Sequence, residues 1–167
     1  MIKRVAIVGA ESTGKTTLAQ QLAEHFGTVW VPEYGREYTE VSVGREAFFD
    51  YKWRNDEFVL IAQKQIELED QLAKTANRVL ICDTDVLATC IWQERYMGAW
   101  SPEVEKIAKQ RTHDLYLLTD CDIPFAQDGL RDGVSGNFVP VDPGGHDCPV
   151  PVPGSLGLLR RPGEVNY

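Results

Sequence analysis

The feature that most constrains this chain is the segment GAESTGKT at residues 9–16, which follows the apolar run VAIV at residues 5–8. It fits the pattern G-x-x-x-x-G-K-[ST], in which a buried strand leads into a glycine loop and the loop opens a helix. The glycines permit backbone conformations that a side chain would block, so the loop amides can wrap a β-phosphate at the positive end of the helix dipole. Because the strand and the helical pattern Leu18, Leu22 and Phe26 flank the loop, the sequence predicts a site for a nucleoside triphosphate.

The side chains of this loop have distinct expected roles. Lys15 is expected to reach the β- and γ-phosphates, and the hydroxyl of Thr16 is expected to hold Mg²⁺. The predicted cofactors are therefore ATP and Mg²⁺. The residues expected to bind the nucleotide are Gly9, Glu11, Ser12, Thr13, Gly14, Lys15, Thr16 and Thr17.

Apolar runs typical of strands alternate with helical patterns along the first 132 residues. Strands are expected at 4–8, 28–31, 78–82 and 115–118, helices at 15–26, 55–77, 87–96 and 102–109, and a long loop or irregular helix at 33–45. This alternation predicts an α/β fold, with a mostly parallel sheet, right-handed crossovers and helices on both faces. Ligands of such sheets bind at the carboxyl ends of the strands, and each motif described below follows a strand.

Charge and composition argue against several classes of function. The chain has 167 residues, which suits one domain, and its net charge of −8 without a basic stripe argues against nucleic-acid binding. No apolar run approaches membrane-spanning length, and the N-terminus lacks a signal-peptide pattern. The four cysteines form no C-x-x-C pair, which fits a reducing cytoplasm. Together with the phosphate loop and the short apolar runs, this predicts a cytoplasmic protein that has a small-molecule partner and contacts no membrane.

An acidic pair follows the predicted strand at 78–82. Asp83 stands where phosphate-loop proteins place a carboxylate that positions Mg²⁺, directly or through water. Asp85 lies two residues further on and could point the same way, so a role in metal binding or as a base is open to both carboxylates. The alternative is that Thr84 or Asp85 caps the following helix, and both roles can hold at once.

The segment EYGRE at residues 33–37 follows the second predicted strand. The carboxylate of Glu33 would face the phosphate loop across the cleft and could accept the proton of an attacking hydroxyl. The sequence leaves this role open between Glu33 and Asp83. Arg36 could grip an acceptor oxygen or the transferring phosphoryl group. The alternative is a surface ion pair between Arg36 and a nearby glutamate, worth under about 1 kcal/mol.

A glycine loop follows the last predicted strand of the domain. Its arginine, Arg131, suits a lid that stabilises charge on the γ-phosphoryl group, and the alternative is a solvated turn. The histidines His25, His113 and His146 have no partner spacing, so solvated or capping roles are expected. The four tryptophans share no helical spacing, so most are expected in the core, with one near the cleft able to stack on a base.

Four segments occur here in a particular order and spacing: VAIVGAESTGKTT at 5–17, EYGREY at 33–38, ICDTD at 81–85 and DGLR at 128–131. Together they resemble the ribosylnicotinamide kinase domain of the NadR family, a phosphate-loop (P-loop) kinase, over residues 1–132. The resemblance implies a three-layer P-loop kinase fold and ATP-dependent phosphorylation of nicotinamide riboside to nicotinamide mononucleotide, in NAD salvage. With the assignments above, the expected catalytic residues are Lys15, Glu33, Asp83 and Arg131, the substrate-binding residues are Tyr34, Arg36, Asp85 and Asp128, and the metal ligands are Thr16 and Asp83.

The chain departs from this pattern in two places. The last 35 residues hold seven of the 14 glycines and six of the nine prolines, so residues 133–167 are expected to form an irregular tail. The final strand of the family would then be missing, which would leave the strand at 115–118 with an unpaired edge. Pro32 stands where some relatives carry an aromatic residue, so the acceptor could be another nucleoside.

Three further readings remain open on the sequence. A deoxynucleoside-type kinase shares the plan of a phosphate loop, a glutamate after the second strand and a lid arginine. An ATP-binding regulatory module or a GTPase-like switch is the second alternative. A GTPase would need N-K-x-D after a strand, which is absent, and the D-x-x-G at 142–145 lies in the tail. An inactive kinase fragment would be consistent with the altered C-terminus.

Overall fold

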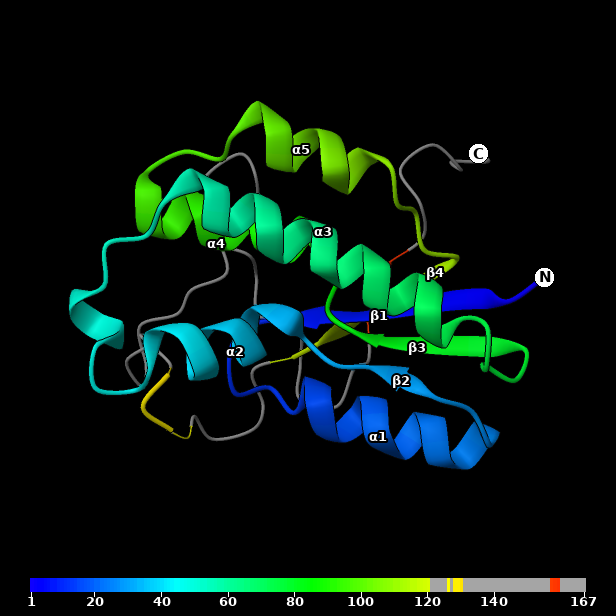
Figure 1. Cartoon of the computed structure of the whole chain (residues 1–167). Coiled ribbons are helices and arrows are strands. Elements are labelled where there is room, and N and C mark those ends of the chain that lie inside the picture. The colour runs from blue at the N-terminus through cyan, green and yellow to red at the C-terminus, as the bar shows by residue number, and fades with distance from the viewer. Residues whose placement is uncertain (121–125, 127, 131–156, 160–167) are drawn as a thin grey trace.

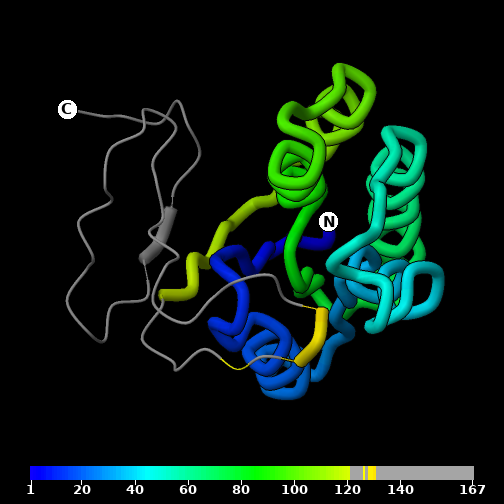
Figure 2. The backbone as a smooth tube through the Cα atoms, turned by 90° about the vertical axis from the view of Figure 1, so that its left-hand side faces the viewer, coloured from blue at the N-terminus to red at the C-terminus, as the bar shows by residue number. Residues whose placement is uncertain are grey.

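The computed structural model describes residues 1–120, 126, 128–130 and 157–159. A central sheet lies between the helix α1 on one face and the helices α3, α4 and α5 on the other side (Figure 1 and Figure 2). The helices are α1 (Lys15–Phe26), α2 (Tyr34–Tyr38), a π-helical turn (Thr39–Val43), a 3₁₀ turn (Phe48–Asp50), α3 (Asn55–Leu72), α4 (Val86–Met97) and α5 (Pro102–Lys109). These layers confirm the predicted α/β sandwich.

The sheet has the strand order β2-β3-β1-β4-β5. Its strands are β1 (Lys3–Gly9), β2 (Trp30–Val31), β3 (Val79–Asp83), β4 (Leu115–Thr119) and β5 (Gly157–Leu159). The first four strands run parallel, as predicted, and β5 pairs antiparallel with β4. The parallel strands therefore end together at one edge, where the phosphate loop begins.

The expectation that the edge of β4 would remain unpaired is wrong. The three residues of β5 pair with it and satisfy backbone groups that an open edge would expose. A strand this short has no periodic pattern for sequence reasoning to detect. The rest of the predicted tail lies outside the described residues.

Local signals explain where the helices begin and end. Gly14 stands before α1 with a φ of 78°, and Gly27 ends the helix with a φ of 56°. The hydroxyl of Ser101 accepts a hydrogen bond from the backbone of Val104 and caps α5, as its sequence predicts. The segment expected as a loop or irregular helix at 33–45 is largely helical, and it contains the π-helical turn.

Three apolar clusters hold these layers together. Ile7 and Ile81 pack against α1 on one face of the sheet, while Leu80 and Cys82 face the C-terminal part of α3 on the other. The third cluster joins α3, α4 and α5 away from the sheet and contains Phe58, Ala62, Val86, Cys90 and Val104. Among the described residues, no helix combines the length and apolar character that crossing a membrane requires.

Candidate functional site

The phosphate loop connects β1 to α1, and its glycines are required by its geometry. Gly9 has a φ of 149°, and a side chain there would collide with Thr119 at the end of β4. Gly14 has a left-handed backbone, and so does Ser12, with a φ of 62°. The hydroxyl of Thr13 lies 2.6 Å from that of Thr119 and donates to the carbonyl of Ala10 at 2.8 Å. The loop is therefore anchored to the end of a neighbouring strand.

Lys15 and Thr16, for which the sequence predicts phosphate and metal roles, stand at the end of the loop and the start of α1. The ammonium group of Lys15 donates to the carbonyl of Ala10 at 2.6 Å, so it folds back over the loop. The hydroxyl of Thr16 donates to Oδ2 of Asp83 at 2.5 Å. This contact joins the start of α1 to the end of β3.

The oxygen atoms around Thr16 and Asp83 fit a magnesium ion. Asp83 is 2% exposed, and its Oδ1 atom has no hydrogen-bond partner in the part of the chain that the structure describes. Burial raises the pKa of this carboxyl group, and the hydrogen bond from Thr16 opposes the rise. Hydroxyl and carboxylate oxygens are the ligands that Mg²⁺ takes alongside phosphate oxygens and water, so these two residues would hold it.

Glu33 follows β2 and lines the same cavity as the phosphate loop. Burial is the main reason that its pKa rises to about 7, and the charge of Lys15 opposes the rise while that of Asp83 adds to it. The amide side chain of Gln65 holds the backbone on both sides of Glu33. Its oxygen accepts from the N–H of Tyr34 at 2.8 Å, and its nitrogen donates to the carbonyl of Pro32 at 3.4 Å.

Arg36 brings two of the sequence motifs together. Its guanidinium group lies 2.6 Å from the carboxylate of Asp128 and 3.4 Å from that of Glu40. The ion-pair alternative thus holds in part, but the shorter contact crosses to the DGLR segment. Both Arg36 and Leu130 line the cavity, and the N–H of Ala126 donates to the Ser12 hydroxyl at 2.8 Å. The chain just before the DGLR segment therefore contacts the phosphate loop through Ala126, while Arg131 lies outside the described residues.

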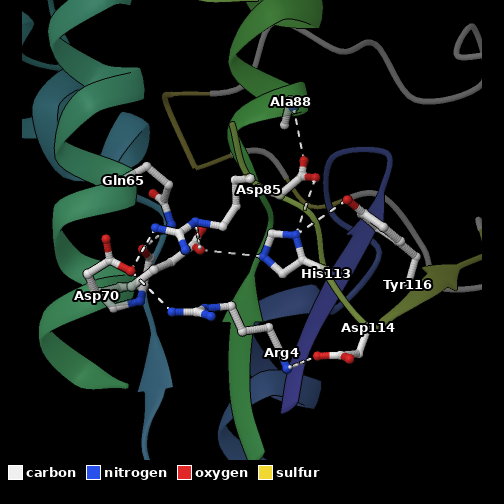
Figure 3. A network of polar contacts seen from close by, with 11 residues as sticks. Arg4, Gln65, Asp70, Asp85, Ala88, His113, Asp114 and Tyr116 are labelled. Atoms are coloured by element: carbon white, nitrogen blue, oxygen red, sulfur yellow. Dashed lines mark hydrogen bonds and ion pairs between the residues drawn. The ribbon is translucent and has the colours of Figure 1, made fainter. Parts of the chain in front are cut away.

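Asp85 takes the capping role that the sequence left as an alternative. It is 5% exposed, accepts from the N–H of Ala88 at 3.3 Å and does not line the cavity as far as the structure describes it. It belongs to a buried polar network with His113, whose Nδ1 lies 3.9 Å from Asp85 and 3.3 Å from the hydroxyl of Tyr116 (Figure 3). The solvated or capping role expected for His113 is wrong, because the residue is 1% exposed and its Nε2 lies 3.6 Å from the buried carboxylate of Glu69, which in turn lies 3.2 Å from the guanidinium of Arg111.

The cavity itself has a volume of about 220 Å³ and two chemically different halves. The expected nucleotide-binding residues line one half, and Tyr34 is not among the described lining residues. The other half is aromatic and is formed by Phe48, Trp53, Phe58, Trp92 and Tyr96. The rings of Trp53 and Tyr96 stack at 5.5 Å and 19°, and those of Trp92 and Tyr96 at 5.9 Å and 16°.

Sequence reasoning expected one tryptophan near the cleft, but it did not identify the cluster of rings or Gln65. The rings come from the 3₁₀ turn, the segment before α3, α3 and α4, so long-range packing assembles them. The spacing of Trp92 and Tyr96, four residues apart on α4, was the one local signal that both rings share a face. An apolar, aromatic compartment beside a phosphate loop can hold the flat base of a nucleoside.

Comparison with known proteins gives matches over most of the chain. A family model described as an AAA domain matches residues 4–135. The trifunctional NAD biosynthesis/regulator protein NadR of Escherichia coli K12 is 33% identical over 130 residues, which cover 78% of this chain and 31% of that protein. NadR of Salmonella typhimurium LT2 matches with the same identity and coverage. This chain thus spans about a third of the length of these relatives.

Solved structures show the same similarity in three dimensions. The crystal structure of NadR in complex with NR has a TM-score of 0.57 and 25% identity, and the match covers 80% of this chain and 37% of that one. NadR in complex with NAD and AMP-PNP also gives 0.57 and 25%, over 70% of this chain and 34% of that one. Thymidylate kinase from Ehrlichia chaffeensis, with a TM-score of 0.51 and 19% identity over 71% of this chain and 75% of that one, shares the fold.

Proposed function

This chain belongs to the AAA domain family and carries a NadR-like P-loop kinase domain, and we propose that it uses ATP and Mg²⁺ to phosphorylate nicotinamide riboside. The product would be nicotinamide mononucleotide, and the reaction would take place in the cytoplasm. One observation carries the proposal. A single cavity joins the phosphate loop to a compartment of stacked aromatic rings, with the Glu33 carboxylate in its lining.

The chemistry of the acceptor fits this compartment. The pyridine ring of nicotinamide riboside is planar and positively charged, and aromatic faces attract both flat rings and cations. If the ring stacks beside Trp53 and Tyr96, the ribose lies toward the phosphate loop. The 5′-hydroxyl would then meet the γ-phosphate of an ATP bound at Lys15. A NadR protein similar to this chain has been crystallised with NR, which supports the same acceptor.

The proposed transfer needs few protein groups because phosphoryl transfer depends mainly on positioning and charge. The hydroxyl oxygen forms a bond to the γ-phosphorus, the bond from that phosphorus to the β,γ-bridging oxygen breaks, and ADP leaves. Glu33 accepts the hydroxyl proton, and Lys15 balances negative charge on the phosphates. Mg²⁺ held by Thr16 and Asp83 would neutralise the developing charge on the bridging oxygen.

An ADP-release assay against a panel of nucleosides tests this proposal. The panel holds nicotinamide riboside, adenosine, thymidine and deoxycytidine, each with ATP and Mg²⁺. We expect nicotinamide riboside to give the highest kcat/KM. Release with deoxynucleosides alone would contradict the proposed acceptor, and no nucleoside-dependent release would contradict kinase activity altogether.

A further inference from the structure

A buried carboxylate lies behind the aromatic half of the cavity. Glu57, in the first turn of α3, is 2% exposed and is not among the described residues that line the cavity. Its Oε1 atom accepts hydrogen bonds from the hydroxyls of Tyr51 at 2.6 Å and Tyr38 at 2.9 Å. Its Oε2 atom accepts from the backbone N–H of Arg54 at 2.9 Å, and the Arg54 guanidinium lies 4.0 Å away.

The two tyrosines connect Glu57 to the cavity through one tryptophan. The ring of Tyr51 meets the ring of Trp53 edge-on at 5.1 Å, and the ring of Tyr38 lies 6.4 Å from it on a tilted plane. Trp53 in turn stacks on Tyr96, and both line the cavity. Fixing the two hydroxyl groups therefore limits how far the Trp53 ring can turn.

Helix capping explains only part of this arrangement. The bond from the Arg54 N–H to Oε2 is the reciprocal half of a capping box at the start of α3. That role uses one oxygen, whereas the second oxygen is committed to two tyrosine hydroxyls. Removing a carboxylate from water is unfavourable unless hydrogen bonds replace its hydration, and the tyrosines supply them. Burial raises the pKa of Tyr38 to about 12, and the bond to Glu57 adds to the rise, so this hydroxyl remains a donor at any physiological pH.

We propose that Glu57 is a positioning residue for the acceptor pocket, holding Tyr38 and Tyr51 so that Trp53 presents a fixed ring face to the acceptor's base. The inference rests on the proposed function, since it assumes that the aromatic half of the cavity receives the base. It assigns Glu57 no contact with the substrate. Its effect should therefore appear in the binding of the acceptor and leave ATP binding alone.

The first test compares Glu57→Gln with wild type. Glutamine keeps the size of the side chain, but its amide cannot accept from the tyrosines on one atom and from Arg54 on the other. We expect the acceptor KM to rise about five- to tenfold, while kcat and the KM for ATP change less than about twofold. The matched control is Glu67→Gln, which removes an exposed carboxylate of the same helix that pairs with Lys64 at 2.6 Å, and it should change none of these.

A second variant separates positioning from capping. Tyr51→Phe removes one hydroxyl and leaves the bond from Arg54 to Glu57 intact, so it should raise the acceptor KM with little effect on helix stability. It also keeps the proposal testable if Glu57→Gln does not fold. An unchanged acceptor KM in Tyr51→Phe together with an unchanged KM in a folded Glu57→Gln would overturn the proposal.

A measurement without turnover makes the two hypotheses separately falsifiable. The indole N–H resonance of Trp53, assigned by its loss in Trp53→Phe, should show a lower ¹⁵N order parameter in Glu57→Gln and Tyr51→Phe, while that of Trp30 stays constant. Equal order parameters for Trp53 in all variants would overturn the positioning role. If wild type phosphorylates no nucleoside while Trp53 becomes mobile, the proposed function fails and the positioning role survives.

Discussion

Replacing Glu33 with glutamine removes a carboxylate whose pKa is raised to about 7, mainly because burial strips its hydration. If this group accepts the proton of the acceptor hydroxyl, only its ionised form is active. With such a pKa, about one tenth of the carboxylate is ionised at pH 6 and about nine tenths at pH 8. Wild-type kcat/KM should therefore rise about tenfold between these pH values, and Glu33→Gln should be much less active and lack the rise.

The raised pKa of Glu33 also predicts that the rise in pH that increases activity lowers the stability of the folded chain. The pKa of Glu33 in the folded chain lies above its ordinary value of 4.5, so folding favours the protonated form. The stability that the protonated carboxyl group gives the folded chain is fully present at pH values below 4.5 and is lost as the pH rises through about 7. At pH 8 the wild type then carries a desolvated charge that glutamine lacks. Glu33→Gln should be more stable than wild type there by about 1–3 kcal/mol, and the difference should shrink toward pH 5.

Two assays check these expectations. ADP release gives kcat/KM from pH 5.5 to 8.5. Dividing the kcat/KM of wild type by that of Glu33→Gln at each pH cancels the effect of ATP titration, because ATP titrates equally in both assays. Urea unfolding of both proteins at pH 5 and pH 8 gives the stability difference. A ratio that stays constant with pH, with no gain in stability for the variant at pH 8, would refute the role and the environment assigned to Glu33.

Three further substitutions test the rest of the site. Lys15→Ala should lower kcat/KM by a factor of a few hundred, because a transition-state contact of about 3–4 kcal/mol is lost. The thermal midpoint of the variant should stay near that of wild type, and an unchanged kcat/KM would exclude the phosphate contact proposed for Lys15. Asp83→Asn should need more Mg²⁺ for half-maximal rate and recover in part at high Mg²⁺, and an unshifted Mg²⁺ titration would argue against a metal ligand. Gln65→Ala should lower the free energy of unfolding in urea by about 1–3 kcal/mol, because the backbone groups beside Glu33 lose their hydrogen-bond partner. Equal stability would show that the hydrogen bonds of Gln65 to this backbone are dispensable.

Local sequence signals were enough for the framework of this protein. The phosphate loop, α1 and α5 could be predicted because glycines, caps and apolar spacing act over a few residues. The meeting of Thr16 with Asp83 followed from the rule that parallel strands end at one edge. The link between Arg36 and Asp128 joins two motifs that the sequence singled out separately.

The features that the sequence did not reveal depend on packing between distant segments. The stacked rings of Trp53 and Tyr96 come from separate elements, and nothing in either segment indicates the partner. His113 looked solvated because its acidic neighbours, Asp85 and Glu69, lie on other elements. The pairing of β5 with β4 depends on three residues of a glycine- and proline-rich tail. The lid role of Arg131 stays a prediction, as does the domain boundary near residue 132.

The central claim is transfer of the γ-phosphate of ATP to nicotinamide riboside, and ³¹P NMR of the reaction mixture tests it most directly. With the protein, ATP, Mg²⁺ and nicotinamide riboside, the account predicts a new phosphomonoester resonance that grows in step with ADP and is absent without the riboside. Intact ATP, or ADP accompanied only by inorganic phosphate, would contradict it.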